Sequence, residues 1–166
     1  PAGASSPELT KPLLAISGRL DRTIGGRPVD VAGDPHNRRR TIYGLIDRQD
    51  LPGLFRAFDF AAPDQTVARR SETATPQQSL FSMNSAFMIE QAKALAARLR
   101  TEGADDRARI SRGFALVFGR PPTAEEEELA LAFLRTPSQS KARGILSRWE
   151  QYSQVLLSAN ELMYLR

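Results

Sequence analysis

The feature that most constrains the fold is the run of residues 75–99, which predicts a long amphipathic helix with a well-defined start. Thr75 fits the N-cap, Pro76 the first helical position and Gln78 the partner that completes a capping box. After this start, one residue in every three or four falls on a single, mostly apolar stripe. The stripe consists of Phe81, Asn84, Met88, Ala92, Leu95 and Leu99. Because Asn84 interrupts an apolar stripe, we expect its side chain to be buried and hydrogen-bonded to backbone or to the preceding loop.

The N-terminal part of the chain predicts one helix followed by irregular structure. Apolar residues recur at helical spacing from Leu9 to Ile24, and the Gly25–Gly26 pair is expected to stop that helix. Residues 40–46 are rich in β-branched and aromatic side chains, and their periodicity does not decide between a short strand and a helical turn. If they form a strand, residues 28–31 are its candidate partner.

Three more helices with short connections are expected after the long one. Asp105 or Asp106 fits the start of a helix that Gly119 ends, and Thr123 with Glu126 forms a second capping box. The core-facing residues expected in these helices are Ile110, Phe114 and Val117, then Leu129, Phe133 and Leu134, then Ile145, Trp149, Tyr152, Leu156, Ala159 and Met163.

These patterns predict a mainly α fold: a helical, bundle-like domain with long irregular loops and at most one short β-hairpin. A chain of 166 residues with 41% hydrophobic residues has the material for one such domain. We expect residues 1–6 to be frayed, residues 7–75 to form a helix plus an irregular segment, and residues 76–166 to form a four-helix unit.

Composition excludes several classes of site. The chain has no cysteine, so disulfides, thiolate metal sites and cysteine nucleophiles are absent. Its formal net charge is +4, with acidic residues interspersed among the basic ones, which favours local ion pairing over a nucleic-acid surface. No stretch approaches the roughly 20 apolar residues of a membrane span. Because the chain opens without methionine, we expect a processed form or a piece of a longer protein.

No motif for catalysis, metal binding or cofactor binding stands out. The single histidine, His36, lies in a turn-like segment without a second histidine nearby, which is typical of a surface residue. The four glutamates at 125–128 point in different directions on a helix and complement its dipole, so they do not form a carboxylate pair. The sequence therefore predicts neither a metal site nor a cofactor.

The charged loop at residues 59–75 is the place where a recognition surface is expected, if the chain has one. Loops of this length are usually functional or disordered. We expect this loop to be ordered and packed across the start of the long helix. The residues expected nearest to such a surface are Tyr43, Arg48, Asp59, Asp64, Arg70 and Asn84. The simpler interpretation is that the same residues only hold the fold together.

Five stretches of the sequence resemble one family. They are SGRLDRTIGG, RRTIYGLIDRQDLPGLFRAFDFAAPD, TPQQSLFSMNSAFMIEQAKALAARL, FGRPPTAEE and WEQYSQVLLSANELMYL. The family is the planctomycete-specific domain of unknown function number 1553. The resemblance implies a C-terminal module of large secreted bacterial proteins, which often carry a cytochrome-c-like domain upstream. It implies no established activity and supplies no catalytic residues.

Three hypotheses about function follow from the residues and the resemblance. The leading one is a non-enzymatic module of a secreted, extracytoplasmic multidomain protein, which binds its own upstream domains or an extracellular ligand such as a glycan. The second is part of a carbohydrate-directed hydrolase whose loop carboxylates include Asp59 and Asp64; two carboxylates about 5–10 Å apart in one cleft would favour it. The third is polyanion binding through the arginine clusters at 38–40 and 69–70.

Overall fold

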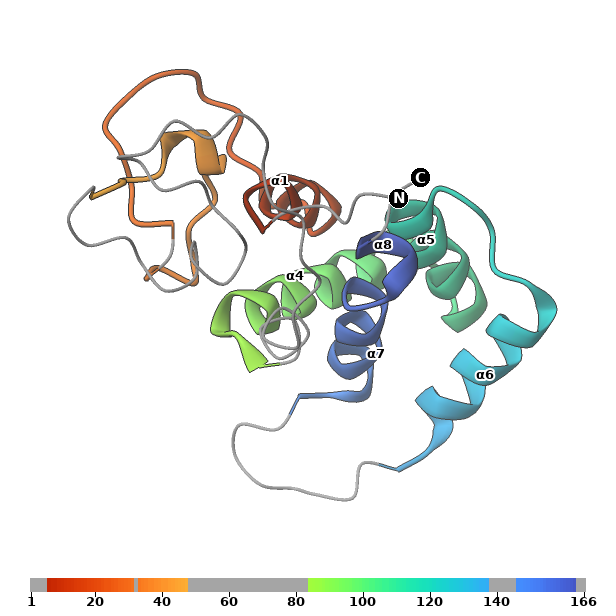
Figure 1. The fold of residues 1–166 in the computed structure, drawn as a ribbon. Coiled ribbons are helices and arrows are strands. Elements are labelled where there is room, and N and C mark those ends of the chain that lie inside the picture. Colours follow the sequence, from red (N-terminus) through yellow and green to blue (C-terminus); the bar gives the residue numbers. More distant parts are fainter. Residues whose placement is uncertain (1–5, 32, 48–83, 138–145, 164–166) are drawn as a thin grey trace.

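The computed structural model describes residues 6–31, 33–47, 84–137 and 146–163, and it is mainly helical as predicted. The described helices are α1 (Ser6–Ile16), the 3-10 helix η1 (Thr41–Tyr43), α4 (Ala86–Glu102), α5 (Asp106–Phe118), α6 (Ala124–Arg135), α7 (Arg148–Leu157) and α8 (Asn160–Met163). Helix α4 lies at the centre, with α7 and α5 packed against it and α6 outside those two (Figure 1). Helix α1 packs on α4 from the other side, and beyond it lies a loop-rich region.

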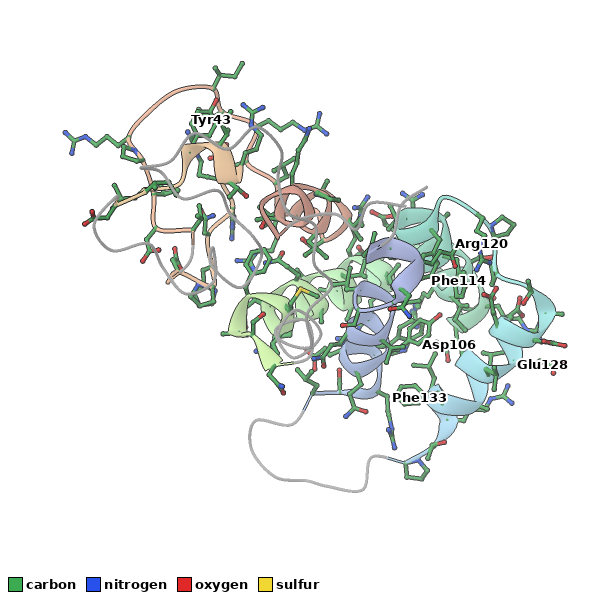
Figure 2. The ribbon with its side chains drawn as sticks, viewed as in Figure 1. Tyr43, Asp106, Phe114, Arg120, Glu128 and Phe133 are labelled. Atoms are coloured by element: carbon green, nitrogen blue, oxygen red, sulfur yellow. The ribbon has the colours of Figure 1, made fainter. Side chains whose placement is uncertain are left out.

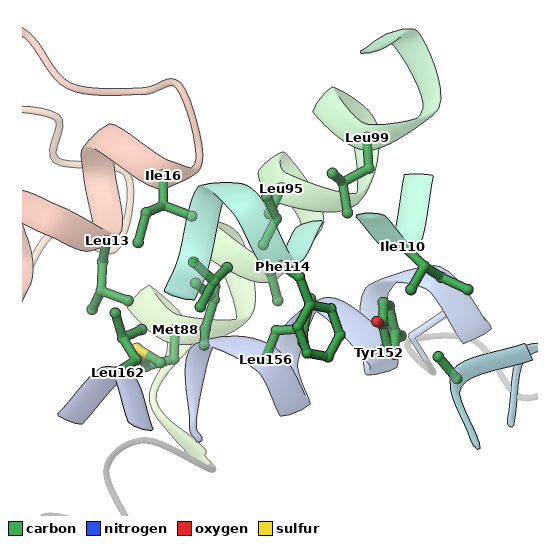
Figure 3. Close-up of a cluster of buried hydrophobic side chains, with 14 of the residues drawn as sticks. Leu13, Ile16, Met88, Leu95, Leu99, Ile110, Phe114, Tyr152, Leu156 and Leu162 are labelled. Carbon is green, nitrogen blue, oxygen red and sulfur yellow. The ribbon is translucent and has the colours of Figure 1, made fainter. Parts of the chain in front are cut away.

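The core joins all the helices of the described segments except η1. Its side chains come from α1, α4, α5, α6, α7 and α8, and Figure 3 shows Phe114, Leu156 and Tyr152 at its centre. The predicted inward-facing residues of α4 after Asn84 and of α5 are all buried, which confirms the helical stripes there. The buried residues of this core cluster are Leu13, Ile16, Met88, Ala92, Leu95, Leu99, Ile110, Phe114, Val117, Ala130, Leu131, Tyr152, Leu156, Leu157 and Leu162.

Helix α1 ends eight residues earlier than the apolar spacing predicts. The amide of Gly18 donates to the carbonyl of Ala15, and that of Arg19 to Leu14, which is the Schellman pattern. Gly18 has φ +76°, a conformation that favours glycine. The guanidinium of Arg98 on α4 also donates to the carbonyl of Ile16 at 2.8 Å. The chain therefore leaves the helix at residue 17, and the expected helix up to Ile24 is wrong.

A buried hydrogen bond also joins the end of α1 to α4. The Ser17 hydroxyl donates to Oε1 of Gln91 at 2.8 Å, and both side chains are buried. The amide nitrogen of Gln91 has no hydrogen-bond partner in the part of the chain that the structure describes. Gln91 is thus a buried polar residue on the core face of α4 that the apolar stripe did not predict.

The start of α4 corrects the prediction of one continuous helix from residue 76. Ser85 is extended (φ −70°, ψ 139°) and its hydroxyl accepts a hydrogen bond from the amide of Met88, so Ser85 is the N-cap. Asn84 precedes this cap and is exposed, so it is not the buried member of the stripe that we expected. The expected capping box at Thr75 lies outside the described residues.

The remaining helix boundaries follow the predicted caps, with two differences. Asp105 caps α5 and Gly119 ends it with φ +70°, while Thr123 and Glu126 form the predicted capping box of α6. The last predicted helix begins at Arg148, because Ser147 forms a capping box with Glu150. It is also divided into α7 and α8, because the chain turns at residues 158–159.

The buried face of helix α6 differs from the one that was predicted. Leu129 was expected in the core but is 71% exposed, whereas Ala130 and Leu131 are buried. Phe133 and Leu134 pack against the core from its edge. Of the residues expected on the face of the last helix, Tyr152 and Leu156 are buried and Trp149 is only partly buried.

Candidate functional site

Residues 18–31 and 33–47 form a loop-rich unit, which we call the arginine lobe because six of its residues are arginines. Three aspartates shape its turns: the carboxylates of Asp21, Asp30 and Asp34 accept hydrogen bonds from the amides of Thr23, Gly33 and His36. Such short-range bonds are the reason that aspartate favours turns. They give the lobe a defined backbone without regular secondary structure.

Two isolated parallel bridges connect separate segments of the lobe. They pair Asp21 with Arg39 and Val29 with Gly44. The segment 40–46, which was predicted as either strand or helical turn, contains both features: η1 is followed by a bridge in which the Leu45 amide donates to the Val29 carbonyl. Residue 29 lies within the predicted partner segment 28–31. The bridges are parallel, so the described residues contain no β-hairpin here.

Tyr43 holds the lobe together from its middle (Figure 2). Its hydroxyl oxygen accepts hydrogen bonds from the amide of Gly25 at 3.2 Å and from Nη2 of Arg40 at 2.8 Å. The guanidinium of Arg39 lies over the ring, 4.4 Å from its centroid, and also pairs with Asp21 at 3.7 Å. The hydrogen bond from the Gly25 amide is the largest cause that holds the pKa of the Tyr43 phenol below its usual value, and the charge of Arg40 adds to it.

The arrangement around Tyr43 leaves other side chains of the lobe on the surface. Ile24 is 85% exposed, Ile42 is 82% exposed and Leu45 is 57% exposed. Arg22, Arg27 and Arg38 are exposed too, and none of the three has an ion-pair partner within the described segments. The surface of the lobe therefore combines aliphatic groups with unpaired positive charge.

Glu90 on α4 anchors the lobe to the helices. Its carboxylate oxygens lie 2.8 Å from Nζ of Lys93, 3.5 Å from Nδ1 of His36 and 3.9 Å from Nη1 of Arg19. The hydrogen bond from Lys93 is the largest cause of the lowered pKa of Glu90. His36 is exposed, as predicted for a surface histidine, and the described residues contain no cluster of acidic or histidine side chains that could hold a metal ion.

Of the six residues of the predicted recognition surface, the structure describes Tyr43 and Asn84. Among the described residues, Tyr43 makes its hydrogen bonds and ring contacts with Gly25, Arg39 and Arg40, and the recognition surface stays a prediction. The other predicted site residues, together with the loop 59–75, lie outside the described residues. They are Arg48, Asp59, Asp64 and Arg70.

A second charged cluster, centred on Arg120, was not predicted. This arginine pairs through two nitrogens with Glu126 and through two with Glu161, all at 2.8 Å, and also donates to the Pro121 carbonyl at 3.2 Å. All five of its N–H groups are therefore used. Its guanidinium also lies 5.4 Å from the ring centroid of Phe114.

The Arg120 cluster joins the start of α6 to α8. Glu126 lies only six residues after Arg120 and is the glutamate of the capping box with Thr123. Its position near Arg120 could therefore be recognised in the sequence. Glu161 lies 41 residues away, and no local pattern could indicate it. Because every donor of Arg120 is occupied within the chain, we interpret this cluster as part of the fold and not as a ligand site.

Acid is expected to weaken the fold through this cluster. Arg120 is the largest cause that lowers the pKa of Glu126 from 4.5 to about 2. A carboxyl group with a lowered folded-state pKa stabilises the fold fully above about pH 4.5, and that stabilisation is lost as the pH falls towards 2. We therefore expect Glu126→Gln to be less stable than the parent at pH 7 and to lose less stability between pH 4.5 and 2. Urea unfolding across that range measures this, and equal pH dependence of the two proteins would contradict it.

None of the helices in the described segments is long and apolar enough to cross a membrane.

Comparison with known proteins identifies the family without assigning an activity. A family model described as "PSD1: Protein of unknown function (DUF1553)" matches residues 5–134. The matched range includes α1, the arginine lobe, α4 and α5, and it ends within α6, so the motif at residues 149–165 lies beyond it. No curated protein and no solved structure matches the chain. The chain belongs to the PSD1 family of proteins of unknown function, DUF1553.

Proposed function

We propose that this chain is a protein-docking module whose contact surface is the arginine lobe, and that it has no catalytic centre of its own. One observation carries the proposal: a small lobe with a fixed backbone exposes three aliphatic side chains, Ile24, Ile42 and Leu45. Single exposed apolar residues are common on proteins, but three large exposed aliphatic side chains on one small lobe favour a protein-interaction site. The exposed arginines of the same lobe fit the polar rim of an interface and favour an acidic partner.

The rigidity of the lobe supports this function. The bonds around Tyr43 and the aspartate turns fix the backbone before any partner arrives. A surface that is already ordered loses less conformational entropy on binding than a flexible loop does. The lobe is also tied to α4 through Glu90, so a bound partner is held in a defined orientation relative to the helices.

Docking to protein fits the lobe better than binding to a polyanion. In the arginine triad 38–40, the side chains of Arg39 and Arg40 are engaged with Tyr43, Asp21 and Gly25, which leaves Arg38 as the exposed member. Of the two engaged arginines, Arg39 forms an ion pair with Asp21, whereas Arg40 donates to the Tyr43 hydroxyl. We propose that the partner is another domain of the same secreted, extracytoplasmic polypeptide, as the family resemblance suggests.

A titration of this chain against the remainder of its parent polypeptide tests the proposal. We expect association, and we expect the double variant Ile24→Ser/Ile42→Ser to bind about tenfold or more weakly, because two exposed aliphatic groups are lost from the contact. Val155→Ser, which changes an exposed aliphatic residue on α7, is the matched control and should bind like the parent.

Two outcomes would overturn the proposal. One is the absence of association at any attainable concentration. The other is association that the double variant leaves unchanged. A steep fall of affinity with salt, with no effect of the double variant, would instead indicate binding to polyanions.

A further inference from the structure

The outward face of α6 carries a second exposed aliphatic site. Leu129 is 71% exposed, and Glu125 and Glu128 beside it are exposed and have no cationic partner within the described part of the chain. The two glutamates between them are different, because Glu126 is bound by Arg120 and Glu127 by Arg107. Residues 125, 128 and 129 share one side of a helix, so the leucine and the two free carboxylates form one surface. We call it the α6 face.

The α6 face complements the arginine lobe in charge and in chemistry. The lobe exposes Arg22, Arg27 and Arg38, which have no carboxylate partner among the described residues, and it also exposes Ile24 and Ile42. Opposite charges around aliphatic centres are the arrangement that guides and stabilises protein association. In Figure 1 the lobe and α6 lie at opposite ends of the molecule, with α1 and α4 between them. One chain therefore cannot pair its own lobe with its own α6 face.

We infer that the α6 face of one copy of this chain docks on the arginine lobe of a second copy. This inference rests on the proposed function, because it uses the same docking surface and names a second partner for it besides the domain of the parent polypeptide. Since the two contacting surfaces differ, the contact is head-to-tail, and it extends to further copies unless the rotation closes a ring. A partner domain bound to the lobe would compete with the second copy.

Sedimentation velocity of the full 166-residue chain tests the inference. We expect the average sedimentation coefficient to rise with protein concentration, and to rise less at high salt because screening weakens the charge contacts. Two variants remove one surface each: Ile24→Ser/Ile42→Ser changes the lobe, and Glu128→Gln/Leu129→Ser changes the α6 face. All four positions are exposed, so both variants should fold, which circular dichroism checks. Val155→Ser is the control and should associate like the parent.

Mixing the two variants distinguishes this contact from other kinds of self-association. Each variant alone should remain monomeric, since each lacks one of the two surfaces. An equimolar mixture should form pairs and stop there, because the remaining free ends carry the altered surfaces. We expect the affinity of that pair to match the affinity of the parent contact within about threefold.

Three outcomes would overturn the inference: a parent that stays monomeric up to millimolar concentration, a variant that associates like the parent, or a mixture that grows beyond pairs. The proposed function fails separately, in the titration against the parent polypeptide. If the titration shows association that depends on Ile24 and Ile42, while sedimentation shows no self-association, the docking function stands and the second copy is excluded as its partner.

Discussion

Replacing Leu99 with alanine is expected to lower the free energy of unfolding by about 3–5 kcal/mol. Leu99 on α4 is fully buried, and Figure 3 shows it among the side chains of the core cluster. The substitution loses the transfer free energy of the side chain and leaves a cavity between helices that are pinned by caps and ion pairs. Urea unfolding at neutral pH, followed by circular dichroism, measures the difference.

Leu129→Ala is the matched control for Leu99→Ala. It makes the same chemical change on an exposed leucine, so we expect a difference from the parent within about 0.5 kcal/mol. If the Leu99→Ala and Leu129→Ala proteins unfolded at the same urea concentration, the position of α4 in the core would be contradicted.

Replacing Gly113 with valine is expected to lower the free energy of unfolding by about 1–3 kcal/mol. Gly113 is a buried residue of α5, and a Cβ atom there would lie 3.2 Å from Leu156 Cδ1 and 3.4 Å from Leu99 Cδ1. Helices α4, α5 and α7 therefore meet at a point where α5 has no side chain. Valine adds a branched group to a position that is already tight, so the neighbouring helices must move apart.

Alanine at position 113 separates crowding from the loss of glycine. A single methyl group needs the leucine ends to shift by only a few tenths of an ångström, and alanine favours a helix over glycine by about 1 kcal/mol. The two effects oppose each other, so we expect Gly113→Ala to be close to the parent in stability. If the valine variant were as stable as the alanine variant, the close approach of the helices at Gly113 would be wrong.

The sequence predicted those features of the fold that depend on residues a few positions apart. The caps at Asp105 and Thr123, the stop at Gly119 and the buried stripe from Met88 to Leu99 all involve neighbours within a turn or two of helix. Such patterns can be recognised because the bonds or contacts form within the same helix. The mainly α class follows from these features.

The wrong predictions involve contacts between distant segments. The apolar spacing continues to Ile24, but Gly18 and the hydrogen bonds from Arg98 end α1 at Ile16. Helix α6 contains several apolar residues that could face inward, and the ion pairs of Glu126 with Arg120 and of Glu127 with Arg107 select Ala130 and Leu131 over Leu129. Periodicity gives the spacing of a stripe, but the partners decide which stripe is buried.

The candidate surface was predictable only in part. Tyr43 was expected near it, and the structure places Tyr43 in the arginine lobe, where its hydroxyl accepts hydrogen bonds from Gly25 and Arg40; its role in recognition stays a prediction. The exposed Ile24 was assigned to a helix, so its exposure could not be foreseen. The contact of Arg19 and His36 with Glu90 joins residues far apart in the sequence and has no local signal.

The bond between Arg98 and the end of α1 sets an order in which the molecule can be completed. During synthesis α1 emerges before α4, and the side chain that binds the carbonyls of Ala15 and Ile16 follows 83 and 82 residues later. Closing a loop of that size has an entropic cost that must be met before the contact forms, and contacts of this kind slow folding. The end of α1 is therefore completed late, although α1 precedes α4 in the chain, because its last contact forms only after α4 has been translated and has folded.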